Sequence, residues 1–273
     1  MKPLVLTLRE RPEQRLDLSP LVPHLLSGRK AADIARTALN TTRERVEVGE
    51  AFHIRMGDPA RTRIEGACDR LDLVGHGMTG GELIVDGNVG VKAGRRMSGG
   101  RLVINGDAGP WAASGMTGGH LEIAGAAGDW LGGPLAGEVT GMRGGVVAVG
   151  GDVGDRAGDR MRRGTIIVQG KAGNYAGSRM LAGTLIVQRS AGLLPGYLMR
   201  RGTIVLGGAA TALAPTFLDC GTHDLIALRL LARFIKAYNG RLASLLQGPL
   251  RRLAGDMAVL GKGEIFLPAH VKP

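Results

Sequence analysis

Hydrophobic positions recur every 19 residues through the middle of the chain, between residues 57 and 208. In each unit a buried-type residue stands five positions after a methionine and another stands two positions further on. Alternation of this kind places both side chains on one face of a short strand. Only one step between successive methionines is longer, at 26 residues. The repeating methionines are Met78, Met97, Met116, Met142, Met161, Met180 and Met199.

A fixed short period with one strand per unit is typical of a solenoid. Since 19 is not a multiple of six, the pattern does not fit the left-handed hexapeptide helix. It predicts a single-stranded right-handed β-helix of seven to eight coils with about 19 residues each, dominated by β-structure. The methionines stand at one fixed point of each coil, so we interpret them as core filling and not as ligands for a soft metal.

The position between the two inward residues should point outward, yet it is apolar in six of seven units. An apolar stripe that runs across seven repeat units is expected to be buried by another part of the chain or by another protein. We expect a C-terminal helix to cover part of it and another subunit to cover the rest. The residues predicted to contact a subunit are Ile84, Val103, Ile167, Ile186 and Val205.

The flanks lack the repeat. Leu4 to Leu8 has the pattern of a strand and Lys30 to Leu39 that of a short helix, while Leu225 to Tyr238 has the spacing of an amphipathic helix. The expected division is an α/β N-terminal cap over 1–56, the β-helix over 57–208 and a helical extension over 209–273.

The composition argues against several classes of function. Aromatic residues make up only 3% of the chain, which argues against a protein that stacks nucleic-acid bases. Two cysteines without motif spacing, and no apolar run of signal-peptide or membrane length, indicate a cytoplasmic protein. The histidines His53, His76, His120 and His223 share no ligand spacing, so no metal site is expected, and no catalytic motif is present.

The net charge of +11 is unevenly placed: residues 141–202 hold ten basic side chains and three acidic ones. Many arginines flank the repeating methionines and should stack in columns. Two interpretations stay open: the arginines are splayed into solvent, or they bind a polyanion or an acidic subunit surface. The candidate binding residues are Arg96, Arg143, Arg160, Arg162, Arg163, Arg179, Arg200 and Arg201.

Trp111 and Trp130 are also 19 residues apart and should lie in adjacent coils. The seven extra residues of the long unit follow directly, within Gly132 to Glu138. An outward aromatic pair beside an extra loop is typical of a subunit interface. Local packing beneath the loop, or a pocket for a small molecule, are the alternatives.

Repeats such as Gly170-Lys-Ala-Gly173-Asn-Tyr-Ala-Gly177 resemble the β-helix shared by the C-terminal domain of glutamate synthase and the C subunit of formylmethanofuran dehydrogenase. The opening Ser27-Gly-Arg-Lys-Ala-Ala-Asp-Ile34, followed by Val46-Glu-Val-Gly-Glu-Ala-Phe52, is similar to that subunit. The ending, Gly255-Asp256 and Gly261-Lys-Gly-Glu-Ile265, is similar to it as well. The length also matches a stand-alone subunit.

The resemblance implies a scaffold subunit without an active site or cofactor of its own. Its partners would be the other subunits of a formylmethanofuran dehydrogenase or of a bacterial formyltransferase/hydrolase complex, with metals only in those partners. The carrier in that family is of the methanofuran type and bears glutamate residues. The resemblance therefore offers an acidic tail as the ligand of the arginine columns. A β-helical enzyme or regulator with a pocket near Trp111 and Trp130 is the competing hypothesis.

Overall fold

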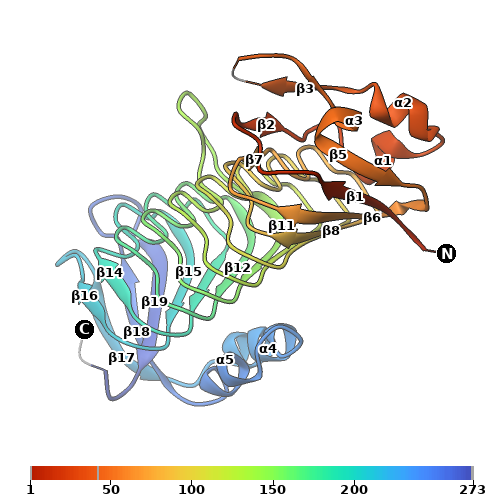
Figure 1. The fold of residues 1–273 in the computed structure, drawn as a ribbon. Coiled ribbons are helices and arrows are strands. Elements are labelled where there is room, and N and C mark those ends of the chain that lie inside the picture. The colour runs from red at the N-terminus through yellow and green to blue at the C-terminus, as the bar shows by residue number, and fades with distance from the viewer. Residues whose placement is uncertain (1, 42, 272–273) are drawn as a thin grey trace.

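A ladder of parallel strands runs through the repeat, and each strand is paired with the next at the same position of its unit. The computed structural model describes residues 2–41 and 43–271 (Figure 1). The repeat strands are β8 (Glu82–Gly87), β9 (Arg101–Ile104), β10 (His120–Ile123), β11 (Arg143–Val149), β12 (Arg163–Val168), β13 (Thr184–Val187) and β15 (Arg201–Leu206).

The register confirms the columns expected from the sequence. Leu83 is paired with Leu102, and the same column continues in register to Ile204. A second, sparser parallel ladder consists of single bridges that join Val89 to Ala108 and so on to Ala191. The seven repeating methionines are completely buried in the main core cluster, which confirms their role as core residues.

Sharp corners return the chain from one strand to the next. Gly100, for example, has φ of +80°, and an added Cβ would lie 2.7 Å from the carbonyl oxygen of Gly81. A side chain would therefore meet both backbone strain and a steric clash at this corner. Several non-glycine residues also adopt left-handed φ at corners, among them Trp111 and Trp130 at 60° and 62°.

The N-terminal segment extends the same sheet. β1 (Pro3–Leu8) lies between β5 (Phe52–Arg55) and β6 (Asp58–Ala67), and β6 pairs with β8. A four-stranded sheet lies beside it and comprises β2 (Leu16–Asp17), β3 (Ala38–Thr41), β4 (Val46–Glu47) and β7 (Leu71–Asp72). The helices are short: α1 (Pro23–Leu26), α2 (Ala31–Ala35) and α3 (Val48–Ala51). The helix expected over residues 30–39 thus ends early, because β3 begins at Ala38.

The C-terminal segment holds more strand than the sequence predicted. β19 (Lys262–Pro268) joins β15 in parallel, and β18 (Leu250–Gly255) and β17 (Leu218–His223) follow antiparallel, so one 13-stranded sheet runs through the molecule. β14 (Ala191–Leu193) and β16 (Ala210–Ala212) form a small separate sheet. The described residues are therefore dominated by strands, with few helices.

Two helices cover the outer face of the later repeat strands (Figure 1). α4 (Ile226–Ile235) and α5 (Gly240–Leu245) bury Ile167, Ile186 and Val205 to 1% exposure or less. This confirms that the C-terminal helix covers part of the apolar stripe. It also corrects the interface prediction for these three residues, because their own chain leaves them no surface to offer.

Ile84 and Val103, on the earlier strands, stay half-buried beyond the end of the helices. They remain the uncovered part of the predicted stripe. No helix in the described part of the chain is long and apolar enough to cross a membrane.

Candidate functional site

Five of the eight candidate arginines are exposed at the edge where the later strands begin. Arg143, Arg163 and Arg201 are the first residues of β11, β12 and β15. Arg143 is paired in register with Arg163, and Arg201 with Lys262. We call this set the basic ridge; it consists of Arg143, Arg162, Arg163, Arg200, Arg201 and Lys262.

The basic ridge differs in its electrostatics from the charged column of the early strands, which lies two to three residues further along each unit. There, Arg101 forms ion pairs with Glu82 and Glu122, both at 3.0 Å, so charges of opposite sign alternate from strand to strand. Among the residues that the structure describes, none of the six ridge side chains forms an ion pair within 4.0 Å. The ridge therefore carries uncompensated positive charge that favours an anion, in two clusters separated by the uncharged Leu181 and Ala182 before β13.

The other three candidates are engaged within the chain. The Arg179 guanidinium donates through Nε and Nη2 to the two carboxylate oxygens of Asp159, both at 2.9 Å. Asp159 is completely buried and also accepts a hydrogen bond from Ser178 at 2.5 Å. The sequence predicted that Arg179 binds an external anion together with the ridge arginines. This prediction is corrected, because the Arg179 guanidinium is already paired with Asp159.

Arg96 and Arg160 are held by the extra loop. Arg96 Nη2 lies 3.2 Å from Oε1 of Glu138, and Arg160 donates to the Glu138 backbone carbonyl at 3.2 Å. Arg96 was predicted to bind an external anion, and this prediction is corrected because its guanidinium is paired with Glu138. The Arg160 guanidinium has only a neutral acceptor among the described residues and keeps a charge for a ligand.

Glu138 fastens the loop to an earlier coil, a role that the sequence reasoning missed. Its Oε1 accepts from Nη2 of Arg95 at 2.7 Å and its Oε2 accepts from the Leu135 backbone N–H at 3.0 Å. The hydrogen bond from Arg95, together with the Leu135 N–H and the charges of Arg95 and Arg96, lowers the pKa of Glu138 from 4.5 to about 2 against the opposing effect of burial. The sequence did contain a signal for this contact, because Glu138 is an acidic residue in an extra loop next to columns of arginines.

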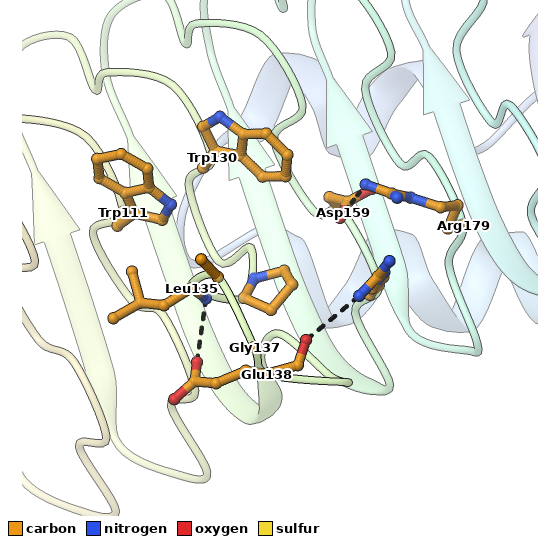
Figure 2. A pocket seen from close by; sticks show the side chains of 10 residues that line it. Trp111, Trp130, Leu135, Gly137, Glu138, Asp159 and Arg179 are labelled. Carbon is orange, nitrogen blue, oxygen red and sulfur yellow. Dashed lines mark hydrogen bonds and ion pairs between the residues drawn. The ribbon is translucent and has the colours of Figure 1, made fainter.

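The loop and the tryptophans line an open pocket of about 350 Å³ (Figure 2). In Figure 2, Trp111 and Leu135 lie at one end of the pocket, Arg179 lies beside Asp159 at the other, and Trp130 lies between the two ends. Arg160 and Glu138 also line the pocket.

The lining combines the tryptophan rings with two guanidinium groups and with the carboxylates of Glu138 and Asp159. Asp159 pairs with Arg179, and Glu138 pairs with Arg95. Among the lining residues that the structure describes, Arg160 is therefore the cation left for the anionic part of a ligand whose apolar part contacts the tryptophans.

The tryptophan column continues as a stack of aromatic and cationic groups. The Arg156 guanidinium carbon lies 5.0 Å from the ring centroid of Trp130 and 4.9 Å from that of Tyr175. These are cation–π distances, so Arg156 is held between two rings. Trp111 and Trp130 are half-buried. This exposure is compatible with both predicted roles, packing beneath the loop and contact with another subunit.

A groove of about 390 Å³ continues from this pocket. It shares Arg160 and Arg179 with the pocket, reaches Arg200 of the basic ridge, and has an apolar lining that includes Leu181 and Leu198. Pocket, groove and ridge are therefore one continuous candidate site for an anionic ligand. No group of three or more potential metal ligands occurs among residues 2–41 and 43–271.

No protein-family model matches the chain, but nearly all of it is similar to a subunit of a named enzyme complex. The C subunit of the formyltransferase/hydrolase complex Fhc, from Methylorubrum extorquens, is 48% identical over 265 residues, which cover 96% of this chain and 99% of that protein. The C subunit of the tungsten-containing formylmethanofuran dehydrogenase 2 from Methanothermobacter thermautotrophicus is 31% identical over 100 residues, 34% of this chain and 37% of that protein.

The fold is also present in a solved complex. A chain of the crystal structure of the formyltransferase/hydrolase complex FhcABCD from Methylorubrum extorquens, in complex with methylofuran, matches with a TM-score of 0.94 and 43% identity. The match covers 97% of this chain and all of that one.

Proposed function

The chain belongs to the family of C subunits of formyltransferase/hydrolase complexes, and from that premise we propose that it is a non-catalytic scaffold subunit of such a complex in the cytoplasm. The complex would transfer a formyl group to and from a methanofuran-type carrier and release formate. Its other subunits would be the partners of this chain and would hold the metals. The near-complete coverage of the Methylorubrum relative supports this assignment.

We propose further that the basic ridge binds the acidic tail of the carrier. The supporting observation is the absence of acidic partners along the ridge in the described residues, in contrast with the ion pairs around Arg101. The ridge has two clusters, on β11–β12 and on β15–β19, with β13 between them. Strands in a sheet lie about 4.8 Å apart, so the clusters are about 10 Å apart and each can contact a carboxylate of an extended chain of glutamates. The groove beside Arg200 would lead the tail away from the pocket.

The scaffold role also fits a finer description of the fold. The 19-residue register and the two parallel ladders support a single-stranded right-handed β-helix over residues 57–208. Residues 1–56 and 209–273 would cap its two ends. A rigid rod of this kind presents the same backbone position every coil, so it can display a linear array of charges.

The test compares two variants of equal net charge in the assembled complex. One carries Arg162→Gln, Arg163→Gln and Arg200→Gln on the ridge. The control removes three charges from exposed arginines outside it, Arg36, Arg43 and Arg45. We expect the ridge variant to retain less carrier at rising salt concentration, with lower turnover, while the control matches the wild type.

Carrier content and turnover that are equal in the two variants would contradict tail binding. Loss of a partner subunit at unchanged carrier content would assign the ridge to an acidic subunit surface instead. Arg160 and Arg179 are left intact in this design because both are tied into the loop and the core.

A second candidate function is supported by the open pocket beside Trp111 and Trp130. Its volume of about 350 Å³ is in the range of small-molecule sites, so the chain could act as an enzyme or regulator by itself. Activity of the purified chain alone would support this function. Activity that requires the partner subunits, and is unchanged by Trp130→Ala, would exclude it.

A further inference from the structure

Helix α4 is apolar on two opposite sides, although only one of them packs against its own chain. Leu228, Ala232 and Ile235 are buried against the sheet. Ile226, Leu230 and Phe234 are 73%, 58% and 46% exposed. A spacing of four residues places these three on one outer side of the helix.

This outer side continues onto the uncovered part of the sheet. Tyr238 follows Phe234 by four residues, and the ring centroids of the two are 5.9 Å apart. Tyr238 also lines an open cavity of about 580 Å³ with Val103 of β9 and Ala148 of β11. Its other lining residues include the polar Arg101, Asn105, Glu122 and Gln169. We call this surface the apolar strip; it consists of Ile226, Leu230, Phe234, Tyr238, Val103 and Ile84.

The charges beside the strip define what can cover it. Residues 226–245, which include α4 and α5, contain no acidic residue. Arg229 forms an ion pair with Asp224, whereas Arg233 and Lys236 are exposed and form no ion pair among the described residues. An occupant therefore needs an apolar centre with carboxylates at the rim of the helix.

A second copy of this chain does not meet that requirement. Two copies that met through α4 would bring the same basic side chains together, and each chain has a net charge of +11. Like charges across an interface oppose association. A different protein with the complementary charge is favoured.

We propose that the apolar strip docks a different subunit of the same complex, by a surface with an apolar groove and an acidic rim. A side chain of that subunit would enter the cavity between Tyr238 and Val103, with a polar end that reaches Arg101, Glu122 or Gln169. Large apolar side chains at the centre of an interface contribute most of its affinity. This inference rests on the proposed membership in a complex of several subunits, but it concerns a surface separate from the basic ridge.

The experiment is a pair of double variants in the full complex. The strip variant carries Leu230→Gln and Phe234→Gln, since glutamine keeps the helix propensity of leucine. The control carries Leu25→Gln and Leu218→Gln, which are 49% and 56% exposed and lie outside the strip. Affinity for the other subunits is measured with purified components, and folding of each variant is checked by circular dichroism and thermal melting.

We expect the strip variant to bind the other subunits at least about tenfold more weakly, at an unchanged melting temperature, and the control to bind within about twofold of the wild type. A photo-crosslinking residue at position 230 should yield an adduct with one identified partner subunit.

Three outcomes would overturn the inference. Equal affinity of the strip variant and the wild type would show that the strip is not an interface, as would adducts only with a second copy. Binding of the wild-type chain to anionic vesicles that the strip variant loses, with unchanged subunit affinity, would assign the strip to a lipid surface. If the wild-type chain itself fails to assemble with the other subunits, the proposed function is wrong and this inference is lost with it.

Discussion

Replacing Glu138 with glutamine should release the extra loop without unfolding the coils. The carboxylate of Glu138 receives hydrogen bonds from Arg95 and from the Leu135 N–H, and its pKa of about 2 instead of 4.5 measures how strongly the folded chain prefers the ionised form. That difference corresponds to about 3 kcal/mol at about 1.4 kcal/mol per pKa unit. Because the Glu138 side chain is 27% exposed, solvent screening reduces the expected loss to about 2 kcal/mol.

The assay is hydrogen exchange of the loop amides, above all the N–H of Leu135, which is bonded to the Glu138 carboxylate. A loss of about 2 kcal/mol in a local opening equilibrium raises the exchange rate about 30-fold. The matched control is Glu122→Gln, which removes a carboxylate paired with Arg101 on a neighbouring coil and should leave the loop amides unchanged.

The pH dependence follows from the direction of the shift. A carboxyl whose pKa is lowered on folding contributes stability above its unfolded value of 4.5 and loses it as the pH falls toward about 2. Loop protection in the wild type, compared with Glu138→Gln at the same pH, should therefore be larger at pH 7 and converge near pH 2. Equal exchange of the Leu135 amide in the two proteins at pH 7 would refute the reasoning.

Three further predictions concern stability. Arg179→Ala should lower the free energy of unfolding by about 3–5 kcal/mol, because it leaves the completely buried carboxylate of Asp159 without its counter-charge. Asp159→Ala should cost less, because the guanidinium of Arg179 that it leaves behind can reach water. Denaturant titration of both variants checks this order. Met161→Ala should cost about 2–5 kcal/mol in the same titration and Met161→Leu less than about 1.5, since the site is fully buried. The melting temperature of the isolated chain should rise with salt, and rise less after the three ridge arginines are replaced, because screening weakens their mutual repulsion.

The repeat was predictable from the sequence because the spacing alone determines which residues become neighbours. Once the period is 19, Leu83 must lie beside Leu102, and the methionines must stack inside. The strands after the repeat were not predictable in this way. β17, β18 and β19 pair across antiparallel registers that depend on where the chain turns back, and no periodic signal in residues 209–273 encodes that.

The candidate site was predictable only in part for a related reason. Columns identify which arginines are neighbours, and this located the basic ridge. They do not identify which arginines a non-repeating residue reaches. Glu138 belongs to the only long unit and contacts Arg95, 43 positions earlier, so Arg96 and Arg160 become part of a loop attachment.

The basic ridge has an energetic consequence that follows from the stacked strands. Neighbouring strands hold equivalent side chains about 4.8 Å apart at the backbone, where two like charges repel by about 1 kcal/mol even in water. The early coils avoid this cost because the residues at their ridge positions, such as Ser98 after Met97 and Thr117 after Met116, are uncharged. In the later coils Arg143 is in register with Arg163, and Arg201 with Lys262, and none of the four forms an ion pair among the described residues. Carboxylates from outside these residues would relieve their repulsion. An acidic ligand along the ridge would therefore gain both its own ion pairs and the relief of that repulsion.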